Sequence, residues 1–308
     1  MHYVLCPLET VRVLDLLALH NVPILETQGN CDVVISGKDY IKSLEISTLG
    51  TLSFCYQNPH MQNSISRNNA TAIIADISLK DSLSLKSSQQ LHIFVEDAHK
   101  TFVTFIRKLV TVVHPTFLNA EDIPTSCYIG PNVIIERGVK IGENVQLVGN
   151  IYIYRNVQIG NSVIIKPGSV IGGQGFGFTL EEGGVQQHFP HIGGVIIEDN
   201  VRIGANVCID CGSIGNTILY RGCRIDNLCH IAHNVEVGEN TCVVAVCMIA
   251  GSVKIGNNTW IGPGSSVLQQ LSIGDDVMIG MHSCVLRNVS NNKLVYGVPA
   301  HANEKHKG

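Results

Sequence analysis

The chain has 308 residues, 45% of them hydrophobic and 15% charged, so it can bury a core and falls within the composition range of globular proteins. Its formal net charge of −4 is spread over 21 basic and 25 acidic residues without a basic cluster, which argues against a nucleic-acid partner. The first residues lack a secretion-signal pattern and the longest apolar runs, such as 243–250, are too short for a membrane span, so we expect a cytoplasmic protein.

Residues 1–112 carry mixed strand and helix signals and predict a small α/β domain. The candidate strands are three short runs at 32–36, 72–75 and 91–95. Asp97 is a suitable N-cap for a following helix whose apolar positions share one face: Ala98, Phe102, Phe105, Leu109 and Val113. His114-Pro115 then ends the helix, because the residue before a proline disfavours helical geometry.

From residue 129 onward an aliphatic residue returns every six positions, in three blocks. The first block holds Ile129, Ile135, Ile141, Leu147, Ile153, Ile159, Ile165 and Ile171. The second holds Ile197, Ile203 and Ile209. The third holds Ile225, Ile231, Val237, Val243, Ile249, Ile255, Ile261, Val267, Ile273, Ile279 and Val285.

A period of six is neither helical nor a simple alternation, and it indicates short strands joined by corners. Three hexapeptides close a triangular coil whose aliphatic side chains stack inward, with Gly, Asn and Asp tolerating the corner geometry. We therefore predict a mainly β fold, a parallel β-helix of roughly seven or eight coils over 113–290, followed by a short tail at 291–308. The two breaks in phase, 172–194 and 211–222, are predicted to be loops that leave the prism.

The 11 cysteines are irregularly spaced, which indicates free thiols in a reducing compartment. Cys208 and Cys211 form one C-x-x-C, but they flank the inward Ile209, and no second C-x-x-C completes a zinc site.

The densest polar group in the third block is RIDNLCHIAHNVEVGEN, which holds Asp226, Asn227, His230, His233 and Asn234. His233 lies two places after the inward Ile231, near a corner, so its imidazole can face outside the prism. In a trimer that outside face becomes a cleft between subunits.

Amide-forming acyl transfer requires a base that works near neutral pH and a hydrogen-bond donor for the oxyanion. His233 supplies the side chain with that range, and Gly251, 18 residues and one coil later, offers a backbone N–H on the adjacent layer. The two positions are expected to stack. From spacing alone, a hydrogen-bonded surface histidine is the commoner explanation, and His230 is a second candidate base.

The stretches IDNLCHIAHNVEVGENT, MIAGSVKIGN, VIIEDNVRIGANVCIDCG and GGQGFGF resemble signature segments of the UDP-3-O-acylglucosamine N-acyltransferases and related nucleotide-aminosugar N-acyltransferases. The resemblance implies a left-handed β-helix, a homotrimer, and a nucleotide-sugar-binding role for residues 1–112. It assigns the catalytic base to His233, the glycine one coil later to Gly251, and the family asparagine to Asn227. Asp226 and His230, from the same polar group, are further candidates for substrate binding.

Several positions depart from the family pattern. Gln174 replaces an aspartate of the glycine-rich segment, and Gln270 replaces a second histidine on a later coil, so we expect a different acyl or sugar pocket. Phe54 and Asn58 match the uridine-contacting segment only partly, with stacking on Phe54 expected. The chain ends soon after its GVPA segment, where the lipid A enzyme continues into a helical extension, and this favours acyl-CoA over acyl carrier protein as co-substrate, with no bound cofactor.

The remaining candidates lie on the first predicted loop. Phe176 and Phe178 are expected to anchor this loop or to pack against the acyl chain or a neighbouring subunit. His188 is expected to contact a sugar or nucleotide phosphate, and His191 is a further substrate-binding candidate. The same histidines with His230 or His233 leave open a zinc hydratase of the β-helical class. The leading hypothesis is acylation of an O-antigen amino sugar, with the lipid A precursor as the alternative acceptor and a non-catalytic scaffold as a third class.

Overall fold

The computed structural model describes residues 2–37, 40–42, 44, 47–56, 68–180 and 183–304. They form two compact units, one from residues 1–113 and 176–192, the other from 114–175 and 193–308. The division at Val113 falls one residue after the end of the predicted α/β domain. None of the helices in the described ranges has the length and apolarity needed to cross a bilayer.

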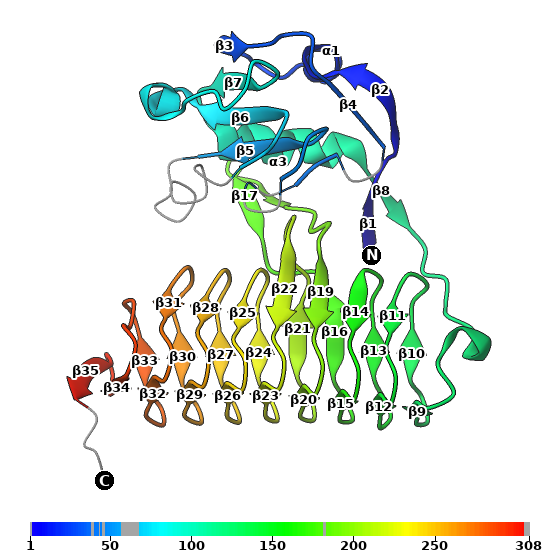
Figure 1. The fold of residues 1–308 in the computed structure, drawn as a ribbon, viewed down its shortest axis with the longest axis vertical. Coiled ribbons are helices and arrows are strands. Elements are labelled where there is room, and N and C mark those ends of the chain that lie inside the picture. Colours follow the sequence, from blue (N-terminus) through cyan, green and yellow to red (C-terminus); the bar gives the residue numbers. More distant parts are fainter. Residues whose placement is uncertain are drawn as a thin grey trace. The chain divides into compact units, whose positions relative to one another are not determined.

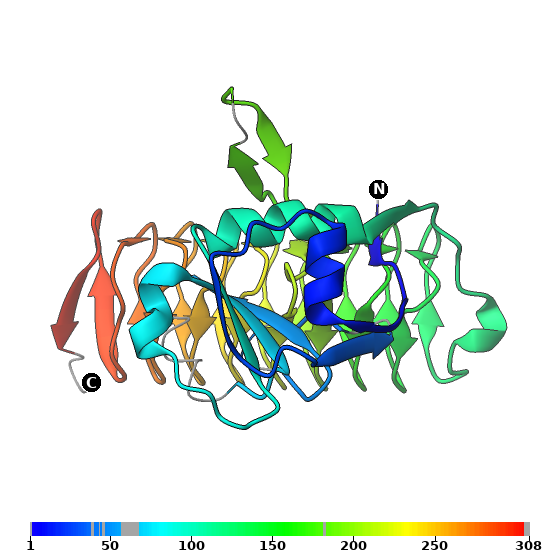
Figure 2. The ribbon, with the colours of Figure 1, turned by 90° about the horizontal axis from the view of Figure 1, so that it is seen from above.

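The first unit is built on a four-stranded sheet with the order β3 (Glu26–Gly29), β7 (Leu91–Val95), β6 (Ala72–Asp76), β5 (Leu52–Cys55) (Figures 1 and 2). Only β3 is antiparallel to its neighbour. Helix α3 (Ala98–Leu109) packs on β5, β6 and β7, and the Asp97 carboxylate caps it by accepting the Lys100 N–H at 2.8 Å. The unit also contains α1 (Val13–Leu19), η2 (Ile77–Ser82), and the strands β2 (Leu8–Arg12) and β4 (Val34–Gly37).

The predicted helix is too long by one turn. It ends at Leu109, and Val110–Val113 forms β8, which pairs antiparallel with β1 (His2–Leu5). The segment VTVV consists entirely of β-branched residues, whose restricted χ1 angles favour a strand once a partner strand is present. The helical spacing of Val113 from Leu109 was therefore coincidental.

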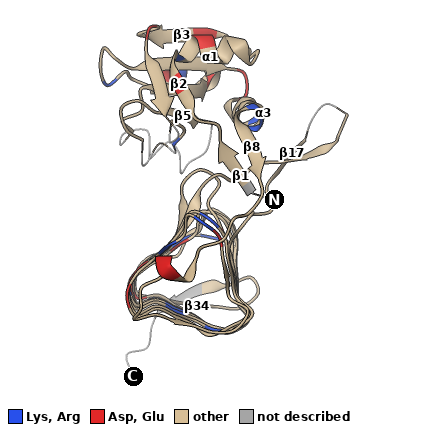
Figure 3. Cartoon of the chain, turned by 90° about the vertical axis from the view of Figure 1, so that its right-hand side faces the viewer, with Lys and Arg blue, Asp and Glu red and all other residues tan. Residues whose placement is uncertain are grey.

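The second unit is a left-handed parallel β-helix whose coils superimpose into one three-sided outline when viewed along the axis (Figure 3). The chain follows η3 (Ala120–Asp122) into the coils and crosses three sheets in a fixed order, which hold ten, eight and seven strands in the described part of the chain. The ten-stranded sheet contains β9 (Tyr128–Ile129), β12 (Gln146–Leu147), β15 (Ile164–Ile165), β20 (Arg202–Ile203), β23 (Arg224–Ile225), β26 (Cys242–Val243), β29 (Trp260–Ile261), β32 (Met278–Ile279), β34 (Lys293–Tyr296) and β35 (His301–Glu304).

The other two sheets complete each coil. The eight-stranded sheet contains β10 (Ile134–Ile135), β13 (Tyr152–Ile153), β16 (Val170–Gly173), β21 (Cys208–Asp210), β24 (His230–Ile231), β27 (Met248–Ile249), β30 (Ser266–Val267) and β33 (Cys284–Val285). The seven-stranded sheet contains β11 (Lys140–Ile141), β14 (Val157–Ile159), β19 (Gly194–Ile197), β22 (Asn216–Leu219), β25 (Glu236–Val237), β28 (Lys254–Ile255) and β31 (Ser272–Ile273).

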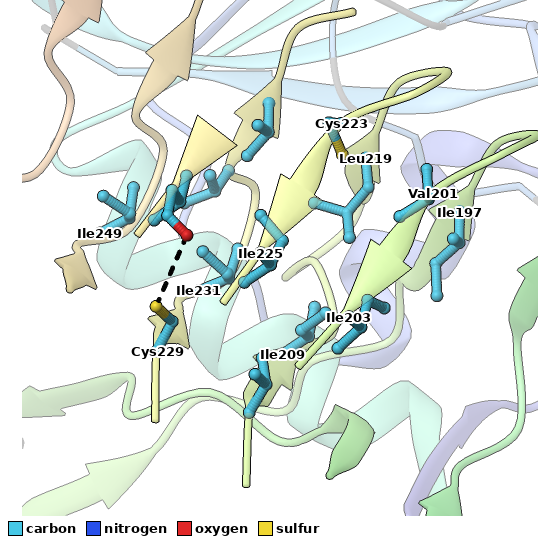
Figure 4. Packing of buried hydrophobic residues seen from close by; sticks show 14 of the residues in the cluster. Ile197, Val201, Ile203, Ile209, Leu219, Cys223, Ile225, Cys229, Ile231 and Ile249 are labelled. Carbon is cyan, nitrogen blue, oxygen red and sulfur yellow. Dashed lines mark hydrogen bonds between the residues drawn. The ribbon is translucent and has the colours of Figure 1, made fainter. Parts of the chain in front are cut away.

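The aliphatic residues of the six-residue period form one continuous core inside the prism. Figure 4 shows part of it, including Ile203, Ile209, Ile225, Ile231 and Ile249. The corner residues adopt the left-handed φ that the turn requires, and asparagine holds many of these positions because its side chain tolerates that region. The predicted inward phase is confirmed.

The second predicted break and the predicted tail contribute strands to the sheets, whereas the first break leaves the prism as predicted. The first break, 172–194, does leave the coil and carries the hairpin β17 (Phe178–Leu180) and β18 (Gln186–His188). The second break does not, because β22 pairs with both β19 and β25 and buries Leu219. Four extra residues between Ile209 and Leu219 shift the sequence phase without removing a strand. Beyond residue 290, β34 extends the ten-stranded sheet by pairing with β32.

Candidate functional site

His233 lies just after β24, at the corner between the eight-stranded and seven-stranded sheets. Ile231 is fully buried inside the prism, whereas His233 is only partly buried and lies outside the core cluster. The ring is placed over Gly251 of the next coil: a Cβ built on Gly251 would lie 2.7 Å from both Cε1 and Nε2 of His233. The predicted stacking of these two positions is therefore present in the structure.

The next coil presents backbone groups at the same corner. Ser252 donates its N–H to the His233 carbonyl at 2.9 Å, and Gln270 donates its N–H to the Gly251 carbonyl at 2.9 Å. No acceptor among the described residues takes the Gly251 N–H. Gln270 thus lies one coil beyond Ser252, in the column of left-handed corner residues that contains Asn234 and Ser252, while Gln269 is the residue one coil beyond Gly251.

Asn234 fixes the orientation of the His233 ring. Its Oδ1 accepts hydrogen bonds from the Ser213 N–H at 3.0 Å and from the Ser213 hydroxyl at 2.7 Å, which identifies this atom as the amide oxygen. The same oxygen lies 3.2 Å from Nδ1 of His233. Nδ1 therefore carries the proton, and Nε2 is left as the basic nitrogen near Gly251.

Burial sets the charge state of the histidine. Desolvation lowers the pKa of His233, and the hydrogen bond with Asn234 opposes this effect in part. The pKa of His230 is also lowered, first by burial and then by the positive charge of a protonated His233. Both rings are consequently neutral at pH 7, as a general base requires.

Asp210 is a carboxylate that the sequence did not single out. It ends β21, one coil before His230, and its Oδ2 lies 3.6 Å from Nε2 of His230. Its side chain is only 15% exposed, and desolvation raises its pKa to about 7. A buried acid next to a histidine is a typical arrangement of functional sites.

Asn227 does not join His233 within one protomer. It lies at the corner between the ten-stranded and eight-stranded sheets, where its Oδ1 accepts the Ala205 N–H at 2.8 Å. The neighbouring Asp226 accepts the Asn227 N–H at 2.7 Å through its own carboxylate. Both side chains brace the corner, and their proposed catalytic and substrate-binding roles remain predictions.

Gln174 lies in the second unit, directly after β16 on the side of the eight-stranded sheet that leads to the seven-stranded one, with its Nε2 3.7 Å from the Cys211 sulfur. The other predicted contacts belong to the first unit. Phe176 is exposed and meets Phe178 edge-on, while His188 stacks on Tyr3.

The remaining two first-unit candidates are buried. His191 is buried, with its Nδ1 2.9 Å from the Phe189 carbonyl. Phe54 is 6% exposed and stacks on Phe102 at 3.8 Å between ring centroids, so it forms core contacts rather than an open platform for a base. Asn58 lies outside the described residues.

Sequence reasoning missed Asp210 and Ser213. Asp210 directly follows the inward Ile209, just as Asp226 directly follows Ile225. In the sequence it is therefore indistinguishable from an aspartate that only shapes a corner. Ser213 lies in the segment assigned to a loop. Among the described residues, no group of three or more His, Cys, Asp or Glu side chains is arranged to hold a metal ion.

Comparison with known proteins places these features in a family. The profile described as bacterial transferase hexapeptide matches residues 252–287, and the hexapeptide repeat of succinyl-transferase matches 126–155 and 194–227. A crystal structure of UDP-N-acetylglucosamine acyltransferase shares the fold, with a TM-score of 0.55 and 22% identity over 62% of this chain and 73% of that one.

Two curated relatives are UDP-3-O-acylglucosamine N-acyltransferases. The one from Pseudomonas syringae is 36% identical over 153 residues, so the chain spans 43% of that relative's length. The one from Cytophaga hutchinsonii is 33% identical over 256 residues, which cover 71% of this chain and 69% of that protein. The chain belongs to the UDP-3-O-acylglucosamine N-acyltransferase family of hexapeptide-repeat proteins.

Proposed function

We propose that the protein transfers an acyl group from a thioester to the amine of a nucleotide-linked amino sugar, with UDP-3-O-acylglucosamine as the acceptor. The observation that carries this proposal is the His233 ring, held by Asn234 with its basic Nε2 beside the Gly251 backbone. The names of the relatives support the lipid A acceptor over the O-antigen sugar that the sequence favoured.

The geometry supports direct attack without a covalent enzyme intermediate. As the amine nitrogen attacks the thioester carbonyl carbon, Nε2 of His233 accepts the proton that the amine loses. The carbonyl oxygen becomes an oxyanion, for which the Gly251 N–H is a donor. The C–S bond then breaks, and the leaving thiolate takes the proton from Nε2, which returns His233 to its starting state.

The surface beyond Gly251 suits an acyl chain. On each coil of the eight-stranded sheet, one outward residue directly follows the inward aliphatic one. This residue is Ala250 after β27, and it is Leu268 and Leu286 on the next two coils. Both leucines are exposed. An extended hydrocarbon that continues from the thioester along the coil axis would cover them and remove apolar surface from water.

The thioester donor is proposed to be acyl-CoA or an acyl carrier protein, and a homotrimer is proposed as the working form. Exposed Leu228 and Val246 at the corner between the ten-stranded and eight-stranded sheets support self-association.

A substrate panel tests the proposal. The protein is incubated with UDP-3-O-acylglucosamine, with UDP-N-acetylglucosamine and with a dTDP-linked amino sugar, each with acyl-CoA or acyl carrier protein as donor, and products are weighed by mass spectrometry. We expect an amide product from the UDP-linked free amine. An amide from the dTDP sugar alone would restore the O-antigen hypothesis, and no amide with any pair would contradict the proposed function. Stoichiometric zinc in the purified protein would support the hydratase instead.

A further inference from the structure

The exposed apolar side chains of the later coils are confined to one side of the prism. Between Arg224 and Leu286, the large apolar side chains that are exposed lie on the ten-stranded sheet, the eight-stranded sheet or the corner between them: Leu228, Val246, Met248, Trp260, Leu268, Met278, Met281 and Leu286. The seven-stranded sheet instead carries an ion pair between Lys254 and Glu236 at 3.1 Å. Two adjoining faces are thus suited to burial, and the third to solvent.

Three copies can bury both faces at once. If the corner between the ten-stranded and eight-stranded sheets points to a threefold axis parallel to the prism, the ten-stranded sheet of each copy meets the eight-stranded sheet of the next. Because each coil adds one strand to each sheet, coils of the same number then face each other. Leu228, Val246 and Met281 lie at that corner, closest to the axis.

The residues that would meet are matched coil by coil. The chain crosses the ten-stranded sheet before the eight-stranded one. On the ten-stranded sheet, the residue just before the inward aliphatic one lies on the side away from the shared corner. On the eight-stranded sheet, the residue just after the inward one does the same, so these two residues lie equally far from the corner. This rule sets the partner's Trp260 opposite Leu268 and the partner's Met278 opposite Leu286, four exposed apolar side chains that would line the two sides of the acyl path. Three coils earlier it pairs Arg202 with Asp210.

Arg202 and Asp210 each lack a strong partner of opposite charge among the residues of the protomer that the structure describes. Arg202 is exposed, and no side-chain hydrogen bond or ion pair engages its guanidinium within the described residues. Asp210 is mostly buried, and the basic side chain that the described structure places beside it is His230 at 3.6 Å, whose lowered pKa leaves it neutral at pH 7. A buried carboxylate is costly unless it is paired.

We propose that the partner's Arg202 forms an ion pair with Asp210 across this interface and so completes the acyl-transfer site beside His230 and His233. The inference rests on the proposed function for its catalytic readout, but not for its assembly readout. The pair holds Asp210 ionised, and Asp210 in turn positions His230 next to the catalytic base. The partner's Arg202 is thus a positioning residue that no single chain can supply to its own site.

Charge reversal tests the pairing without an activity assay. Arg202→Glu and Asp210→Arg are each expected to weaken the trimer, measured by analytical ultracentrifugation across a dilution series, and the double variant to restore it. Lys140→Glu makes the same charge change on the exposed face of the seven-stranded sheet and serves as the control that leaves the trimer intact. Additive weakening in the double variant would overturn the pairing.

Subunit mixing tests whether Arg202 acts across the interface. Arg202→Ala alone is expected to lower kcat/KM roughly 30-fold, the size typical of a lost interfacial charge pair, and to add a titration near pH 7 to its pH profile. Co-expression of Arg202→Ala chains with His233→Ala chains should restore about a quarter of wild-type activity, because that share of random interfaces joins an intact His233 to an intact partner's Arg202.

The controls separate this inference from the proposed function. No recovery in mixed trimers, with wild-type protein active, would place Arg202 in the same protomer as the site it serves and overturn the inference. Inactive wild-type protein would instead count against the proposed function. In that case the charge-reversal series still decides the pairing.

Discussion

His233 and Gly251 lie one coil apart and in contact, with the histidine ring occupying the space that a Cβ on residue 251 would require. Gly251→Ala places a methyl group 2.7 Å from Cε1 and Nε2 and must displace the ring. We expect kcat to fall about 100-fold, because a shift of about 1 Å in a catalytic group has consequences of that size. Steady-state kinetics measure it.

The matched control for that substitution is Gly173→Ala. A Cβ on Gly173 has its nearest neighbour, Cε2 of Tyr154, at 3.8 Å, an ordinary contact. It adds the same methyl group to the same sheet without meeting His233. Equal loss of activity in the two variants would show that Gly251 has no special relationship with the histidine.

The pH dependence of kcat/KM should report on Asn234 and His233. Burial lowers the pKa of His233, so the free base is retained, and activity falls only as pH drops below about 6.5. Asn234→Asp places a carboxylate beside Nδ1, which stabilises the imidazolium and raises its pKa. The acid limb should therefore move to higher pH. An unchanged profile would mean that another group is the base.

His92 in β7 is predicted to destabilise the first unit. It is 1% exposed, and neither ring nitrogen has a hydrogen-bond partner in the described structure. His92→Leu should therefore raise the free energy of unfolding by about 1 kcal/mol at pH 7, measured by urea denaturation. Burial lowers the pKa of His92, so the wild type loses further stability as pH falls through about 6.5, and the gain should grow there.

His114, which is exposed, provides the comparison. His114→Leu removes an imidazole without relieving buried polar atoms, so it should leave the free energy of unfolding at pH 7 nearly unchanged. A destabilised His92→Leu variant would indicate that the ring has an important partner.

Val246 has a strained backbone conformation and also lies at the proposed threefold axis of the trimer. It has a φ of 64°, a region that β-branched residues disfavour, and its side chain is exposed. Val246→Asn should relieve this strain yet weaken the trimer, because it removes an apolar contact at the proposed axis. Ser162→Asn, at a corner with a φ of 58° on the opposite side, should leave the trimer unchanged. Sedimentation across a dilution series distinguishes the two outcomes.

The prism could be predicted from the sequence because its inward positions accept only aliphatic residues, so the six-residue period is directly visible in the sequence. It failed where the local signal was ambiguous. Residues 110–113 fit a helical face and a strand equally well, and only the pairing with β1 decides between them. The inward position of Leu219 in β22 was not predicted, because four inserted residues shift it out of the six-residue period.

Part of the site could also be predicted from the coil repeat. His233 and Gly251 are related by the coil repeat, which spacing reveals. Asp210 contacts His230, and Ser213 donates to the Asn234 amide that holds His233; both contacts join coils separated by irregular segments, and spacing does not encode them. The burial of Phe54 could not be predicted, because it depends on the packing of α3, which the local sequence does not show.

The central claim is that His233 is the base that deprotonates the attacking amine. The most direct test is the rate of amide formation on UDP-3-O-acylglucosamine by His233→Ala, with circular dichroism and sedimentation verifying an unchanged fold and assembly. We predict a loss of about 1,000-fold, within the range for removal of a general base. A variant that turns over within twofold of the wild type would contradict the account.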